Sequence, residues 1–242
     1  NKNDLSIIDG VEGTVTYNPD TKTLNLNEAS ISITGSIACI HAVTDSITID
    51  LVGANNLSGN GWSPITFEAG SFCTIQGSGT LNVSNAHISE RAIYVDDLTV
   101  RNCTVNATAG DRALYCHTGV GTLTLDNATI TASLKADGIK VGTIIGFEEI
   151  IFNGCFISEP AGAVFNHEQR AICDTSGIVV KDTVRIMPEY DLWICGTQVT
   201  GINKDNLSVI DGVEGTVTYN HNSKTLRLEN ANITISGEVR GI

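Results

Sequence analysis

The sequence predicts an all-β protein: a right-handed parallel β-helix of about six coils of ~25 residues, with an N-terminal hairpin and the start of a second copy. Three observations support this prediction. Residues 1–40 recur at 203–242, where 24 of 40 positions are identical. A shorter period of about 25 residues fills the stretch between the two copies. No stretch of 10–15 residues has helical periodicity.

The first element is expected to be a hairpin within residues 1–22 that leads into the first coil. Residues 13–17 and 22–26 alternate apolar and polar side chains, and the NPD of residues 18–20 between them is typical of a turn. The same pattern returns in residues 203–224.

Coils are predicted over residues 23–170, where a Thr-apolar pair recurs. The apolar members are 25, 26, 25, 25 and 27 residues apart, and they are Leu24, Ile49, Ile75, Val100, Leu125 and Phe152. Stacked coils would align these residues as one inward ladder. A second ladder is expected from Leu81, Val105, Ile130 and Ile157. The strand phase slips near residues that tolerate the left-handed conformation of a bend, namely Asn27, Gly77, Asn102, Asn127 and Gly154.

The remaining residues predict a boundary between two modules. Residues 171–188 are less repetitive and are expected to close the first module, which spans residues 1–188. Residues 190–195 would then open a second module in residues 189–242. The second copy stops as its repeat begins, so the sequence is expected to be part of a longer protein. The strand edge left open there would allow edge-to-edge self-association.

Composition excludes several classes of partner. With a net charge of −13, the chain would repel nucleic acid and anionic lipid, because both require Lys and Arg to neutralise phosphate. No apolar run reaches the roughly 20 residues that span a bilayer. The seven cysteines form no CxxC pair and are interpreted mostly as small buried hydrophobes, with one disulfide left open.

Three segments carry a resemblance to a known group of proteins. They are residues 5–18 (LSIIDGVEGTVTYN), residues 22–24 (KTL) and residues 77–84 (GSGTLNVS). The chain resembles, over nearly its whole length, secreted bacterial proteins described as carbohydrate-binding domain-containing, a β-helix group of anaerobic polysaccharide-using bacteria. The resemblance implies export, an extracellular or cell-surface location and glycan binding.

The sequence offers no complete catalytic motif. Polygalacturonase-like enzymes of this fold carry Asn-Thr-Asp, Asp-Asp, Gly-His-Gly and Arg-Ile-Lys motifs; here only Asp96-Asp97 and the GIK of residues 138–140 imitate two of them. Asp96 and Asp97 are interpreted as turn residues. No cofactor is predicted, although a calcium site built from Asp side chains and backbone carbonyls is left open. None of the five histidines has the helical spacing of a metal-ligand pair.

One strip of side chains is a candidate binding surface. In each coil an apolar residue is followed by a variable one, and if the first points inward the second points outward. The pairs are Ile40-His41, Ile65-Thr66, Ile93-Tyr94, Leu114-Tyr115, Ile139-Lys140 and Val164-Phe165. Tyr94 and Tyr115 would lie on adjacent coils, with His41 and Lys140 on the same strip. Aromatic faces with polar tips suit sugar rings.

Neighbouring residues complete this candidate site. Asp96, Arg112 and His117 lie close in sequence to the two tyrosines and could supply hydrogen bonds. Trp62 follows Gly59-Asn60-Gly61, and a tryptophan on a loop is a further candidate. The alternative interpretation is that outward aromatic ladders only stabilise stacked strands.

Together with the resemblance to secreted carbohydrate-binding proteins, the sequence predicts an exported, non-enzymatic glycan-binding or adhesive module, repeated in tandem in a cell-surface protein, whose partner is a polysaccharide or glycan. Two alternatives stay open. One is a purely structural stalk or protein-binding adhesin, and the other is a polysaccharide lyase or glycoside hydrolase of the β-helix type.

Overall fold

The computed structural model describes residues 4–43 and 46–235, and it is all-β apart from one short 3-10 helix, η1 (Leu207–Val209). The chain forms two compact units, one ending at Ile186 and the other beginning at Met187; the sequence placed the boundary after residue 188. Residues 1–3 of the predicted hairpin and 236–242 of the predicted second module lie outside the described residues. Within the described ranges, no helix has the length and hydropathy that crossing a bilayer requires.

The first unit begins with the predicted hairpin. Strand β1 (Val11–Asn18) pairs antiparallel with β2 (Thr23–Ser32), with a bulge between Glu12 and Thr14. Gly13 occupies this bulge with φ +78°, and a Cβ there would lie 2.3 Å from the carbonyl oxygen of Glu28. Only glycine fits such a site, which explains why the hairpin carries a glycine at this position.

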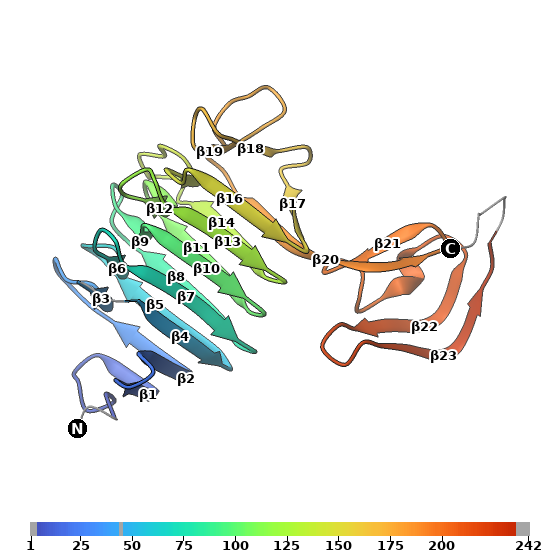
Figure 1. Cartoon of the computed structure of the whole chain (residues 1–242), viewed down its shortest axis with the longest axis horizontal. Coiled ribbons are helices and arrows are strands. Elements are labelled where there is room, and N and C mark those ends of the chain that lie inside the picture. Colours follow the sequence, from blue (N-terminus) through green and yellow to red (C-terminus); the bar gives the residue numbers. More distant parts are fainter. Residues whose placement is uncertain (1–3, 44–45, 236–242) are drawn as a thin grey trace. The chain divides into compact units, whose positions relative to one another are not determined.

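The coils stack as parallel strands in two sheets (Figure 1), confirming the predicted parallel β-helix. Three columns of strands make up its sides. The first is β2, β4 (Ile47–Val52), β7 (Phe72–Gly77), β10 (Asp97–Arg101), β13 (Thr122–Asp126) and β16 (Glu149–Asn153). The second continues from the far half of β2 through β5 (Ala54–Gly59), β8 (Thr80–Asn85), β11 (Thr104–Ala109) and β14 (Thr129–Leu134). The third is β3 (Ile40–Ala42), β6 (Ile65–Phe67), β9 (Arg91–Val95), β12 (Arg112–Cys116) and β15 (Ile144–Ile145).

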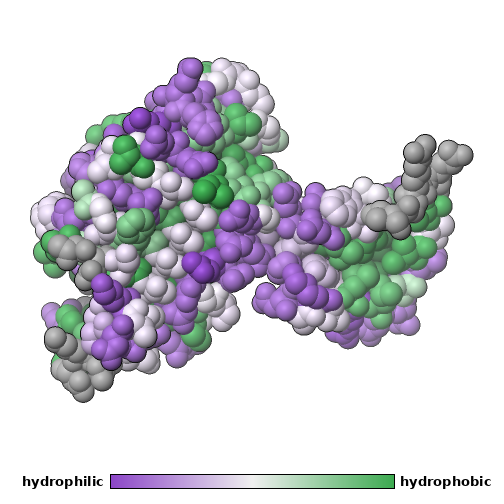
Figure 2. Space-filling view, viewed as in Figure 1, coloured by the Kyte–Doolittle hydropathy of each residue, from purple (hydrophilic) through white to green (hydrophobic). Residues whose placement is uncertain are grey.

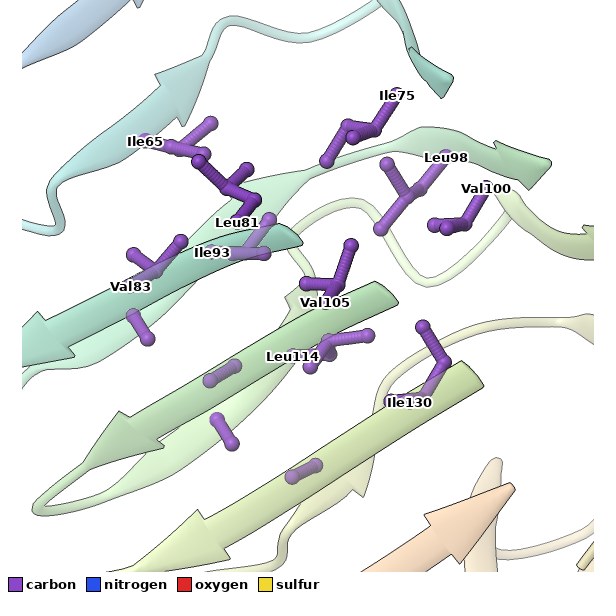
Figure 3. Packing of buried hydrophobic residues seen from close by; sticks show 14 of the residues in the cluster. Ile65, Ile75, Leu81, Val83, Ile93, Leu98, Val100, Val105, Leu114 and Ile130 are labelled. Carbon is purple, nitrogen blue, oxygen red and sulfur yellow. The ribbon is translucent and has the colours of Figure 1, made fainter. Parts of the chain in front are cut away.

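The predicted inward ladder of the first column is confirmed. The strand registers place Leu24, Ile49, Ile75, Val100, Leu125 and Phe152 opposite one another in consecutive coils. Ile49, Ile75, Val100 and Leu125 are completely buried. Figure 3 shows how side chains of this ladder meet those of the other columns inside the solenoid. Each coil thus buries its apolar face only because its neighbours stack on it.

Left-handed residues form the bends between the first and second columns. Gly77, Asn102, Asn127 and Gly154 have positive φ, as their positions in the sequence pattern predict. In the first coil the left-handed residue is Glu28, the neighbour of the predicted Asn27. The bend is therefore a fixed feature of the coil, filled by Gly or Asn in most coils.

The predicted second ladder is wrong at its last member. Leu81, Val105 and Ile130 are in register, but Ile130 then pairs with Ile186 instead of Ile157. The cause is β20 (Val184–Ile194), which returns antiparallel between β14 and β17 (Cys155–Glu159). The two strands that follow β17, β18 (Val164–Asn166) and β19 (Ala171–Cys173), also pair antiparallel. About five turns result, where the sequence predicted about six.

The second unit repeats the hairpin. β22 (Val213–Asn220) and β23 (Thr225–Ile233) pair with the same register as β1 and β2, including the bulge. The far half of β20 and β21 (Thr197–Thr200) form a second strand pair. A small core joins the two pairs and η1, and it consists of Tyr190, Ile194, Val199, Leu207, Ile210, Val213 and Val217. Hydrophobic surface remains over the β22–β23 hairpin (Figure 2), where Leu226, Leu228 and Ile233 are exposed.

The cysteines pack as the sequence suggests. Five of the seven are buried and two are half-buried, and all seven are thiols. Burial raises the pKa of Cys39 to about 11 and that of Cys103 to about 12, so both stay protonated at neutral pH. Cys103 belongs to the core, and Cys39 packs against it.

Candidate functional site

Two copies of one short motif lie side by side on the third column. Residues 90–94 (ERAIY) have their last four residues in β9, and residues 111–115 (DRALY) have their last four residues in β12. The register places Arg112 opposite Arg91 and Tyr115 opposite Tyr94. The alanine and the aliphatic residue of each motif are completely buried, so the arginine and the tyrosine are left half-buried on the outer side. The motif therefore builds the same outward pair twice, one coil apart.

The outward residues form an aromatic cluster. The ring centroids of Tyr94 and Tyr115 are 5.7 Å apart, and the ring of His117 lies 5.1 Å from that of Tyr94. The guanidinium carbon of Arg112 lies 4.6 Å from the Tyr115 centroid, and that of Arg91 lies 5.6 Å from the Tyr94 centroid and 5.5 Å from the Tyr115 centroid. These distances are typical of cation–π contacts. We call this set, Arg91, Tyr94, Arg112, Tyr115 and His117, the paired-tyrosine face.

Each arginine is also held by the acid that precedes it. Arg91 lies 2.9 Å from the carboxylate of Glu90, and Arg112 forms an ion pair with Asp111. Two atoms of this arrangement are buried without a hydrogen-bond partner: Oδ1 of Asp111, an acceptor, and Nε of Arg91, a donor. An unsatisfied buried polar atom costs about 1–3 kcal/mol, so this arrangement carries a cost in the folded state.

The phenol of Tyr94 stays protonated at neutral pH. Burial raises its pKa above the usual 10, and the nearby Tyr115, Glu68 and Asp96 add to the increase, while the positive charge of Arg91 opposes it. Tyr94 is therefore a hydrogen-bond donor in the physiological range, and it is not poised as a general base.

Asp96 lies beside this face but does not belong to it. Its side chain is buried, and its two oxygens accept hydrogen bonds from the backbone N–H groups of Gly70 and Thr118, each at 3.1 Å. The sequence assigned Asp96 a role in hydrogen bonding to a ligand. In the structure Asp96 instead fixes the loops that contain Gly70 and Thr118. This agrees with the interpretation of Asp96 as a turn residue.

Lys140 does not lie on the predicted strip. The sequence aligned Ile139-Lys140 with Leu114-Tyr115, but the structure pairs Leu114 with Ile144 and Tyr115 with Ile145. The segment between β14 and β15 is longer than in the other coils, so counting a constant period gives the wrong register. Lys140 instead lies 3.8 Å from the carboxylate of exposed Asp182.

His41 and Trp62 form a second, smaller group near the start of the solenoid. His41 shares the row of the tyrosines, because it pairs with Thr66, which pairs with Tyr94. Its ring lies 6.2 Å from that of Trp62, and its Nε2 lies 3.0 Å from the carboxylate of Glu68. Thr66 is buried and separates this pair from the tyrosines. The row of strand positions that was predicted to form one continuous strip therefore carries two separate clusters of side chains.

The structure adds functional candidates that the sequence reasoning missed. Arg91, Glu90 and Asp111 belong to the cluster as firmly as Arg112 does. The repeated acid-Arg-Ala-aliphatic-Tyr motif in residues 90–94 and 111–115 was visible in the sequence. The two copies lie closer together along the chain than the period of the coils, so an alignment on that period does not bring them into register.

The outward asparagine ladder of the second column satisfies its own hydrogen bonds. Asn82 donates to Asn56 at 3.0 Å, and Asn106 donates to Asn82 at 2.8 Å. These amides stabilise the stacked coils, whereas the paired-tyrosine face keeps polar atoms that lack a partner. Among the described residues, no three His, Cys, Asp or Glu side chains are grouped as a metal site would require.

The chain was compared with protein families, curated proteins and solved structures. No protein-family model, no curated protein and no solved structure matches this chain.

Proposed function

We propose that the first unit is a non-catalytic saccharide-binding module of an exported or cell-surface protein, and that it binds through the paired-tyrosine face. The observation that carries this proposal is the in-register pair of Tyr94 and Tyr115, each with a guanidinium at its ring. The resemblance of the sequence to secreted carbohydrate-binding β-helix proteins supports the same function and the same location.

The chemistry of the face suits a sugar. The C–H faces of a pyranose ring are apolar and pack on aromatic rings, whereas its edges carry hydroxyl groups. Tyr94 and Tyr115 offer two ring surfaces one coil apart, about 4.8 Å along the solenoid. The phenol of the half-buried Tyr94 stays protonated, so it can donate a hydrogen bond to a sugar hydroxyl. A phenol and a sugar hydroxyl can each donate and accept a hydrogen bond, so the two groups can pair.

Several features argue for binding over hydrolysis. Glycosidases place two carboxyl groups on either side of the scissile bond. Near the paired-tyrosine face, Asp96 is held by backbone N–H groups, while Glu90 and Asp111 are each paired with an arginine. None of the three is left as an uncommitted acid or base.

The test is a glycan array combined with a pull-down on insoluble polysaccharides, each with and without calcium. The wild type would be compared with the Tyr94→Ala/Tyr115→Ala double variant, whose fold is checked by circular dichroism. Trp193→Ala is the matched control, because it removes an exposed aromatic side chain from the second unit. Stacking on two rings is expected to contribute at least tenfold to affinity, so the double variant loses binding and the control keeps it.

The remaining outcomes are equally informative. Binding that survives in the double variant and is lost in Trp62→Ala would place the site on the His41–Trp62 pair. A folded wild type that binds no glycan at all would refute the proposal and favour a structural stalk or a protein-binding adhesin.

A further inference from the structure

The two copies of the hairpin have the same backbone but different surroundings. In the first copy, the N–H of Ile8 donates to the carbonyl of Leu5 and that of Val11 donates to the carbonyl of Ile8, each at 3.1 Å. The same bonds recur at the same lengths among Leu207, Ile210 and Val213. The strand registers of the two hairpins also agree position by position. Because the two backbones are equivalent, a difference in burial between corresponding side chains shows a difference in the segments that pack on each hairpin.

One face is covered completely in the second copy and only partly in the first, where Leu5, Val11 and Tyr17 pack at the edge of the solenoid core and Ile8 is exposed. Ile210 is 5% exposed, whereas its counterpart Ile8 is 52% exposed. Leu207 is completely buried, whereas its counterpart Leu5 is only half-buried. In the second unit the cover is the β20–β21 strand pair, which contributes Tyr190, Ile194 and Val199 to the common core.

The open face has a hollow beside Tyr17. Its volume is about 370 Å³, and its lining is mostly apolar: Leu5, Tyr17, Leu24, Ile40, His41, Ala42, Val43 and Ile47. In the second unit the counterpart of Tyr17 is Tyr219, which contacts the ring of Tyr190 at 5.4 Å. Tyr190 also stacks on His221 at 4.5 Å. The space beside Tyr17 thus corresponds to the space that an aromatic ring of the cover occupies in the other copy.

We propose that the apolar face of the first hairpin, defined by Leu5, Ile8, Val11 and Tyr17, is a docking surface for an antiparallel strand pair of the β20–β21 type. The occupant would present an aromatic and two aliphatic side chains at the positions of Tyr190, Ile194 and Val199. Such a pair belongs to another module of the same repeat, so the surface joins modules end to end. It is separate from the paired-tyrosine face, which lies on β9 and β12.

The chain supplies its own control residue. Ile7 is 74% exposed and its counterpart Val209 is 67% exposed, so this position stays outside the covered core in both copies. Ile7 and Ile8 are adjacent, equally apolar and identical in type. A substitution at Ile8 tests the docking surface, and the same substitution at Ile7 tests general effects of charge.

The experiment adds a second strand pair of the β20–β21 type to the chain. Because the two copies are aligned from Asn1 and Asn203 onward, residues 187–202 directly precede the counterpart of Asn1. A second copy of residues 187–202 would therefore be fused directly before Asn1, at the high effective concentration of a short linker. Amide hydrogen exchange at residues 5–11 is the readout. At least a tenfold gain in protection is expected, lost when Tyr190→Asp and Ile194→Asp are placed in the added segment.

Variants of the face then decide the outcome. Ile8→Asp should abolish the gain in protection, and Ile7→Asp should leave it intact. No gain in the fused chain would overturn the proposal. A native chain that sediments as a dimer, becomes monomeric in Ile8→Asp and gains nothing from the fused segment would also overturn it, because a second copy of the chain would then be the occupant.

Discussion

Asn55 is a buried amide at a position that the other coils fill with aliphatic side chains. It is in register with Leu81, which is in register with Val105 and Ile130, and it is completely buried. Judged by the pattern alone, Asn55→Leu would complete the ladder and stabilise the solenoid. The structure predicts the opposite result.

The prediction follows from the hydrogen bonds of this amide. Its Oδ1 accepts the backbone N–H of Ala29 at 2.9 Å, and its Nδ2 donates to the carbonyls of Val52 and Gly53 at 3.1 and 3.4 Å. The N–H of Ala29 follows the left-handed bend at Glu28 and is buried. Orphaning that donor and weakening the two carbonyl contacts costs about 3–4 kcal/mol. Burying a leucine returns about 1.5 kcal/mol, which leaves a net loss of about 2 kcal/mol.

Urea denaturation followed by far-UV circular dichroism measures this loss. With a slope of about 2 kcal/mol/M, the midpoint should fall by about 1 M. Asn56→Thr is the control, because Asn56 is the exposed neighbour and Thr131 occupies its position in β14. It removes only the exposed hydrogen bond from Asn82, so its midpoint should fall clearly less than that of Asn55→Leu. An Asn55→Leu variant that unfolds at the same or higher urea would show that the aliphatic ladder, not the amide, determines stability at this bend.

Four further predictions test other parts of the structure. Asn127 has φ +46°, so Asn127→Val should cost about 1–2 kcal/mol by urea denaturation, while Asn127→Gly should be close to neutral. Cys39, with its pKa raised to about 11, should react with thiol reagents at pH 8 many times more slowly in the native protein than in urea. Leu26→Asp should unfold the first unit, because Leu26 is completely buried, whereas Leu228→Asp, at the same repeat position but 55% exposed, should change stability by less than about 0.5 kcal/mol. Burial raises the pKa of Tyr94, so the folded state favours the neutral phenol. The free energy of unfolding should therefore be constant with respect to this group below pH 10 and should decrease above it, as denaturation at a series of pH values would measure. Tyr94→Phe should remove the part of the decrease that Tyr94 causes, and absorbance titration would follow ionisation of the phenol in the wild type.

Much of the fold could be predicted because a solenoid is locally encoded. The ladder from Leu24 to Phe152 and the bends at Asn102 and Asn127 each follow from side-chain alternation within one coil. The hairpin followed from its turn and from its recurrence at residues 203–224. Such features need no information about distant parts of the chain.

The errors arose where a distant or irregular segment intervened. Ile157 was placed beside Ile130, but Ile186, far along the chain, takes that position. A constant coil length predicts Lys140 on the strip, but the segment between β14 and β15 is longer than in the other coils, and Ile145 takes that position. The sequence predicts that Asp96 supplies hydrogen bonds to a ligand, but in the folded loops its carboxylate accepts the backbone N–H groups of Gly70 and Thr118.

The candidate site was predicted in part. Tyr94 and Tyr115 do meet on adjacent coils, and Arg112 and His117 do contact them. The contribution of Arg91 and the orphaned oxygen of Asp111 depends on packing between coils, which alternation alone does not describe.

The insertion of β20 between β14 and β17 has a consequence for synthesis on the ribosome. In the second column each strand is normally covered by the strand of the next coil, as Val105 is covered by Ile130. The open edge of β14 instead pairs with β20 through Ile186, which is synthesised more than two coil lengths after Ile130. During that interval the nascent chain presents an unpaired apolar strand edge, the kind of surface that recruits other chains. Slowing translation through residues 135–186 is therefore expected to increase aggregation more than slowing translation through an earlier coil.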